Sequence, residues 1–207
     1  MHSRVLTFTG IAERQPAYPY AGPARAARLA AFVCLTAASA QLAVRLPFTP
    51  VPVTLQTFAI LLTGCLLGSS RGALAAAAYV VEGSLGLPFF SGGTGGIAHL
   101  FGPTGGYLVG CVAAALVAGL FAERGLTTKP LGLLLTLIAA DLVVFIPGVV
   151  WLGAFTGPAK AVTLGFVPFV AGDALKIAAA WSILMAAAMV TARVREQGAR
   201  ENRAARN

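Results

Sequence analysis

The sequence predicts an all-α integral membrane protein, a six-transmembrane-helix bundle with structured outer loops over a pocket and with both termini in the cytoplasm. Three observations favour this fold class. Of the 207 residues, 57% are hydrophobic and only 11% are charged, whereas an average soluble domain is about 25% charged. The apolar residues form runs near the roughly 20 residues that a helix needs to cross the hydrocarbon. The basic residues lie between and beyond these runs, so the net charge of +8 indicates membrane orientation rather than nucleic-acid binding.

The chain divides into an N-terminal tail over 1–24, a membrane domain over 25–192 and a basic C-terminal tail over 193–207. The first tail contains Arg4, Glu13 and Arg14. It lacks the continuous apolar stretch of about 7–15 residues that a secretory signal requires. We therefore expect a short polar tail there. The last tail carries five arginines and is expected to begin as a helix end.

Six apolar segments are the candidate spans, at about 28–44, 54–67, 72–85, 105–121, 131–152 and 168–192. A short outer segment over about 159–166 precedes the last span, and Pro168 suits its first turn because proline has no N–H to leave unpaired. The second and third spans are short, and only residues 68–71 separate them, so a tight hairpin is expected. Short spans are tolerated where they line a cavity; the alternative is that these bounds are trimmed too far.

The basic residues predict the orientation. With six spans, one side of the membrane receives twelve of them and the other side only Arg45 and Lys160. The positive side faces the cytoplasm. The twelve are Arg4, Arg14, Arg25, Arg28, Arg71, Arg124, Lys129, Arg193, Arg195, Arg200, Arg203 and Arg206.

Two outer connections are too apolar to be ordinary solvated linkers. The first, over 45–56, contains three prolines, which stiffen it and remove backbone donors. The second, over 86–107, is rich in glycine, which permits sharp turns and close approach to a ligand. We expect both to fold over the outer end of the bundle as lids. No GxxxxGK[ST] motif occurs, so nucleotide binding is not expected there.

Three charged residues fall at membrane depth: Asp141, Asp173 and Lys176. Each costs roughly 2.5–3.5 kcal/mol at the centre of a span. Asp173 and Lys176 are three residues apart, so they share a helix face and can pair beneath the lids. The pair is interpreted as a ligand site, with a purely structural ion pair as the alternative. Asp141 has two interpretations: it faces the pocket, or it forms hydrogen bonds within the bundle.

Other polar and aromatic residues have two interpretations each. Gln56 and Tyr107 open spans on the outer side and can offer hydrogen bonds to a neutral polar ligand. Trp151 is either an interfacial anchor or an aromatic wall. Glu82 is expected to reach water, and His99 lacks a partner at metal-ligand spacing. The three cysteines lie far apart in apolar runs, are expected to be small buried side chains, and form no metal or redox motif.

Small residues recur every four positions along the first span, at Ala26, Ala30, Cys34 and Ala38. Such a stripe lets another helix approach closely. It serves either packing within the bundle or contact with a partner membrane protein.

Several segments resemble the BioY family of biotin transporter proteins. The stretch Pro50-Val-Pro-Val-Thr-Leu-Gln-Thr-Phe58 looks like the hallmark of that family. Gly86-Leu-Pro-Phe-Phe90, Gly102-Pro-Thr-Gly-Gly-Tyr107 and Gly172-Asp-Ala-Leu-Lys176 are similar to its other motifs, in the same order. The matches together cover roughly residues 28–192. One departure is Asp141, where the family often has asparagine.

The resemblance implies a biotin-binding subunit of an energy-coupling factor (ECF) transporter in the bacterial inner membrane. Such a subunit has six helices and joins a membrane coupling subunit and two cytoplasmic ATPases, so ATP is hydrolysed only by its partners and no cofactor or metal is implied. The last-helix motif assigns biotin binding to Asp173 and Lys176, and the small-residue stripe resembles the surface for the coupling subunit. The candidate binding residues are Asp173, Lys176, Gln56, Tyr107, Phe89, Ser91 and Trp151, with Asp141, Phe48 and Phe90 as further candidates.

Three other functions are alternatives to biotin uptake. One is the same architecture with a different vitamin. Another is a proton-coupled carrier that uses Asp141 and Asp173. The third is an intramembrane enzyme, which is disfavoured because no HExxH motif is present and the two histidines do not converge with the acids.

Overall fold

Each of the six predicted segments coincides with a helix in the computed structural model, which describes residues 22–204. The bounds of the long helices are α1 Gly22–Gln41, α2 Gln56–Leu67, α3 Ser69–Ser84, α5 Gly105–Glu123, α6 Pro130–Thr156 and α8 Val170–Ala204. The short elements are β1 Ala43–Val44, β2 Val53–Thr54, α4 Ala98–Phe101, η1 Leu126–Thr128, α7 Pro158–Gly165 and η2 Val167–Phe169. The mostly helical prediction is therefore confirmed.

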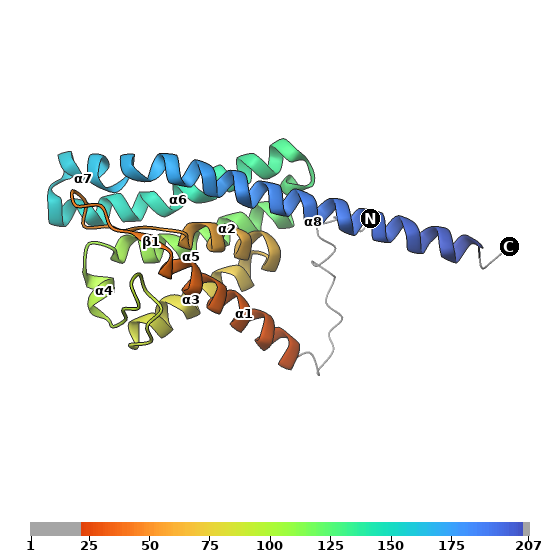
Figure 1. Cartoon of the computed structure of the whole chain (residues 1–207), viewed down its shortest axis with the longest axis horizontal. Helices are drawn as coiled ribbons and strands as arrows, with labels where there is room; N and C mark the ends of the chain where they lie inside the picture. The colour runs from red at the N-terminus through yellow and green to blue at the C-terminus, as the bar shows by residue number, and fades with distance from the viewer. Residues whose placement is uncertain (1–21, 205–207) are drawn as a thin grey trace.

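Three stretches are long and apolar enough to cross a membrane by length and composition, namely Gly105–Glu123, Pro130–Thr156 and Pro158–Val194. Helix α2 is a shorter apolar helix of 12 residues. Helix α8 continues well past the predicted end at 192, to Ala204, and extends beyond the other helices in Figure 1. The first part of the basic C-terminal segment is thus a continuation of this helix.

The connection between α2 and α3 is tighter than predicted, because α3 begins at Ser69 and leaves only Gly68 between the helices. Gly68 has φ +82°, a left-handed conformation that glycine adopts without strain. The Glu123 carboxylate accepts hydrogen bonds from the Ser69 amide at 2.7 Å and the Ser69 hydroxyl at 2.8 Å. A carboxylate at this position caps the first turn of α3.

Residues 68–72 read Gly-Ser-Ser-Arg-Gly and match the GxSxG pattern of serine hydrolases, with Ser70 at the central position. In those enzymes the serine lies on a turn from a strand into a helix. Here the segment joins two helices, and Ser70 is an exposed residue in the first turn of α3. The match therefore reflects the tight turn and carries no sign of a nucleophile.

Helix α5 packs closely against its neighbours through glycine. A side chain at Gly110 would clash with the Val144 backbone of α6, and one at Gly64 of α2 would clash with the Ala115 backbone of α5. Such glycines bring helix backbones into direct contact. The helices α2, α5 and α6 consequently form a tightly packed block.

The connections between α1 and α2 and between α3 and α5 gather at one end of the bundle, with α4 and α7 (Figure 1). Between α1 and α2 the chain forms a short antiparallel ribbon in which Ala43 pairs with Thr54 and Val44 with Val53. Between α3 and α5 a small turn is closed by a bridge between Phe90 and Thr94. The two segments predicted as lids are therefore folded structures over the same end of the molecule.

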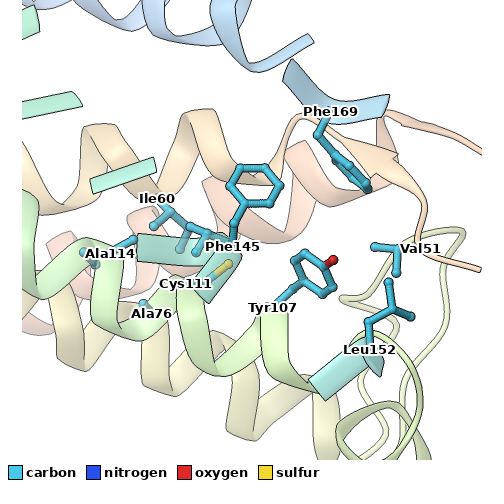
Figure 2. Close-up of a cluster of buried hydrophobic side chains, with 11 residues drawn as sticks. Val51, Ile60, Ala76, Tyr107, Cys111, Ala114, Phe145, Leu152 and Phe169 are labelled. Atoms are coloured by element: carbon cyan, nitrogen blue, oxygen red, sulfur yellow. The ribbon is translucent and has the colours of Figure 1, made fainter. Parts of the chain in front are cut away.

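The cluster of buried residues at this end contains three aromatic rings among smaller apolar side chains. Figure 2 shows Tyr107, Phe145 and Phe169 side by side, with Val51 and Leu152 nearby. The Tyr107 ring lies 6.2 Å from that of Phe145 and 6.1 Å from that of Phe169. Segments far apart in sequence are held together here by apolar burial.

Candidate functional site

A cavity of about 590 Å³ opens at the loop end of the bundle. This volume is within the range of about 300–1,000 Å³ typical of small-molecule sites. Its walls come from both loops, the starts of α2 and α5, the middle of α6, and the start of α8. The polar and charged side chains in its lining belong to Arg45, Thr49, Thr54, Gln56, Thr57, Ser91, Thr94, His99, Thr104, Tyr107 and Lys176.

The predicted ion pair is present at this cavity. Lys176 lines it, and its Nζ donates to Asp173 Oδ1 at 2.6 Å and to Thr57 Oγ1 at 3.2 Å. Both charged side chains are buried, with 8% of Lys176 and 4% of Asp173 exposed. Asp173 is not part of the lining and lies behind Lys176, and its Oδ2 is buried without a hydrogen-bond partner. The cavity wall therefore offers a cation, and the counter-ion behind it keeps one oxygen without a partner.

An ammonium has three N–H donors. Asp173 and Thr57 receive two of those of Lys176. One donor therefore remains for a ligand in the cavity.

Three further predicted residues lie in the cavity wall, namely Gln56, Tyr107 and Ser91. The Gln56 amide approaches Cys111 Sγ at 3.4 Å, and the Tyr107 hydroxyl donates to the Gly165 carbonyl at 2.8 Å. The Ser91 hydroxyl is buried without a partner. An unsatisfied buried hydroxyl is costly, so Ser91 is available to a ligand.

Of the other four aromatic candidates, only Phe90 lines the cavity. Phe48 is 58% exposed. Phe89 stacks on Tyr79, with ring centroids 6.4 Å apart. Trp151 lies outside the lining and its indole N–H donates to the Gly102 carbonyl at 2.9 Å, which fastens the loop before α5 to α6. Phe145 and Phe169, which the sequence did not single out, provide aromatic surface instead.

Asp141 is buried in α6, with 4% exposed, outside the cavity lining. One of its carboxyl oxygens, Oδ1, has no hydrogen-bond partner. His99 lines the cavity and its ring lies against that of Phe90 at 5.2 Å. Among the side chains that the structure describes, no group of three or more His, Cys, Asp or Glu is arranged to hold a metal ion.

Sequence reasoning missed three polar residues of the site. Thr57 joins the ion pair, although it lies within the recognised Pro50–Phe58 motif. Arg45 was noted only for its charge, yet it lines the cavity. Gln41, at the end of α1, binds the loop that carries Phe90 and Ser91.

The small-residue stripe of α1 faces outward. Ala26, Ala30, Cys34 and Ala38 are all exposed, whereas Val33 and Ala37 face the bundle. The stripe therefore does not serve packing within this chain. The expectation that all three cysteines are buried was wrong for Cys34, which lies on this outward face, whereas Cys65 is partly buried and Cys111 is buried.

Comparisons with known proteins agree on one family. The sequence profile of the BioY family matches residues 14–193. A probable biotin transporter BioY of Pyrococcus horikoshii is 42% identical over 152 residues, which cover 73% of this chain and 88% of the relative. The biotin transporter BioY of Thermotoga maritima is 40% identical over 138 residues, or 66% of this chain and 80% of the relative.

A solved structure has a similar fold. The S-component for biotin from an ECF-type ABC transporter aligns with a TM-score of 0.69, over 84% of this chain and 91% of that chain. The two sequences are 24% identical. The likeness therefore concerns the arrangement of the helices.

Proposed function

The chain belongs to the BioY family, and from this membership and the cavity we propose that it captures biotin for uptake across the cell membrane. Biotin has a ureido ring with two N–H donors and a carbonyl, an apolar thioether ring and a carboxylate tail. The cavity lining includes groups that match each of these parts. The observation that carries the proposal is the buried Lys176–Asp173 pair, in which Lys176 lines the cavity with one unused donor and Asp173, behind it, keeps one acceptor oxygen unpaired.

At the cavity floor, the ureido group pairs with both members of the ion pair. Lys176 donates its remaining N–H to the ureido carbonyl, and a turn of the Asp173 carboxylate from behind Lys176 brings Oδ2 to a ureido N–H. Hydrogen bonds to charged groups contribute about 1.5–3 kcal/mol each. The ion pair is electrically neutral, which suits a neutral ring.

At the cavity rim, Arg45 is the cation for the carboxylate tail. Arg45 is exposed and lines the cavity, and it has no carboxylate partner among the described side chains. A guanidinium binds a carboxylate through two parallel hydrogen bonds. Between the two ends, Phe90, Phe145 and Phe169 provide apolar surface for the thioether ring.

Titration calorimetry of the detergent-solubilised protein tests the ligand. We expect heat with biotin and none with thiamine or riboflavin. Heat with thiamine or riboflavin alone would assign a different vitamin to the same architecture. We further expect Arg45→Gln to weaken binding of biotin but not of its uncharged amide, with Lys160→Gln, the other cation assigned to that side, as the matched control.

Biotin uptake then requires partner subunits, and the outward stripe on α1 is the surface proposed for the membrane coupling subunit. Small exposed residues allow a second helix to approach closely. We assign the termini to the cytoplasm, with six spans, because this arrangement gathers the basic residues on one side. The two cytoplasmic ATPases supply the energy, and this chain has no catalytic role.

A second candidate function, proton-coupled carriage, is favoured by Asp141 alone. Its side chain is buried with one oxygen unpartnered, and intramembrane acids of this kind form proton relays in carriers. Uptake of biotin into proteoliposomes that contain only this chain, driven by a pH gradient and abolished by Asp141→Asn, would support it. Uptake that requires the ATPases and survives Asp141→Asn would exclude it.

A further inference from the structure

One side chain at the end of α1 holds the loop that closes the cavity. Gln41 Nε2 lies 3.4 Å, 3.2 Å and 3.2 Å from the carbonyl oxygens of Pro88, Phe89 and Phe90. Its Oε1 accepts from the Gly93 amide at 2.7 Å. The two N–H groups of Gln41 are thus shared among these three carbonyls and that of Ala37, at 3.0 Å in its own helix.

The segment that Gln41 binds, residues 85–97, is termed the lid loop. Phe90 and Thr94 exchange paired backbone hydrogen bonds at 2.9 Å and 3.3 Å, and the Gly96 amide donates to the Gly83 carbonyl of α3 at 2.7 Å. Gly92 and Gly93, at the tip, have positive φ. Gln41 binds both the incoming arm and the tip of this turn, since carbonyls of the arm and an amide of the tip contact the same side-chain amide. It therefore fixes the shape of the turn as well as its position.

The held turn carries the cavity wall. Phe90, Ser91 and Thr94 line the cavity, and Phe90 is 4% exposed. The neighbouring residues Leu87, Pro88 and Gly93 are exposed, so apolar burial fastens only a part of the lid loop. Tyr79 adds one hydrogen bond to the Phe89 carbonyl, at 3.3 Å.

We propose that Gln41 is a positioning residue that latches the lid loop to α1 and thereby limits the rate at which ligand leaves the cavity. This inference rests on the proposed binding of biotin. Gln41 is absent from the cavity lining, so it acts through Phe90, Ser91 and Thr94. Gln41 makes most of the side-chain hydrogen bonds between the lid loop and the rest of the chain, so its release favours opening, and opening precedes ligand exit.

The kinetic test uses Gln41→Met, which keeps the length of the side chain and removes every hydrogen bond to the lid loop. We expect biotin to dissociate about tenfold faster, equivalent to 1.4 kcal/mol, with a smaller change in the association rate. Gln41→Glu keeps the oxygen that faces the Gly93 amide and loses the donors that face the carbonyls, so it should not restore slow dissociation. Leu42→Met, at the adjacent exposed position, is the matched control and should match the parent chain.

A second measurement needs no ligand. Hydrogen exchange of the lid-loop amides, that of Gly93 above all, should be faster in Gln41→Met than in the parent chain, with exchange in α5 unchanged. Equal exchange and equal biotin dissociation in the two proteins would overturn the latch. If the parent chain binds no biotin, the proposed function fails, and the exchange measurement alone decides the latch.

Discussion

Replacing the buried ion pair with neutral residues of similar size separates its two possible roles. Asp173→Asn alone leaves the Lys176 ammonium buried at 8% exposure without a counter-charge. Breaking a buried pair in this way costs roughly 3–5 kcal/mol. For a chain of this size the cost corresponds to a fall of about 10 °C in melting temperature. The double variant Asp173→Asn with Lys176→Met removes both charges, and such replacements are often neutral or stabilising.

The double variant should therefore recover stability without recovering biotin binding. Its melting temperature should return close to that of the parent chain. Its affinity for biotin should remain at least about tenfold weaker, because one lost charge-assisted hydrogen bond exceeds 1.4 kcal/mol. Leu175→Met, between the two residues in sequence and 74% exposed, is the control that should change neither quantity.

The assays are thermal unfolding followed by fluorescence and calorimetry with biotin, both in the same detergent. A double variant that regains both stability and full affinity would show that the pair only supports packing. Single variants with unchanged affinity and intact fold would lead to the same conclusion. Either result refutes the placement of the ureido ring on Lys176 and Asp173.

The remaining predictions concern the partner surface and the packing of the bundle. Ala30→Trp should abolish co-purification with a coupling subunit and leave biotin affinity unchanged. The control Ile183→Trp, on exposed α8 surface, should affect neither. Normal co-purification of Ala30→Trp would contradict the assignment of the α1 stripe to the coupling subunit. Glu123→Ala should lower the free energy of unfolding by about 1 kcal/mol, through loss of the α3 cap, and an unchanged melting temperature contradicts that role. Gly119→Ala should cost about 1–3 kcal/mol, because its methyl group meets the backbone of the α2–α3 turn. Gly153→Ala, with contacts of 3.7–4.0 Å, should be tolerated, and equal melting temperatures for the two glycine variants would contradict the packing argument.

Local spacing predicted the parts of the site that depend on one helix. Asp173 and Lys176 are one turn apart, so their pairing follows from helix geometry in any context. Thr57 joins them from α2, and Arg45 reaches the cavity because the chain folds back between β1 and β2. Contacts of this kind depend on tertiary structure, which a spacing rule does not contain.

Aromatic side chains in loops were the hardest to place. Phe48 and Phe90 both lie within two residues of a proline, yet one is 58% exposed and the other 4%. The direction of each ring follows from the ribbon and from the Phe90–Thr94 bridge, not from composition. Gln41 was missed for the related reason that its partners are backbone atoms, which leave no mark on the sequence.

The glycines of α5 limit the width of the ligand that the cavity can admit. Gly106 and Gly110 already rest on the backbone of α6 at Pro147 and Val144. The side of α5 that carries Tyr107 therefore cannot recede to admit a broader ring. Contact between helix backbones therefore excludes bulkier vitamins. A variant that admits a wider ligand requires smaller side chains on the opposite wall of the cavity.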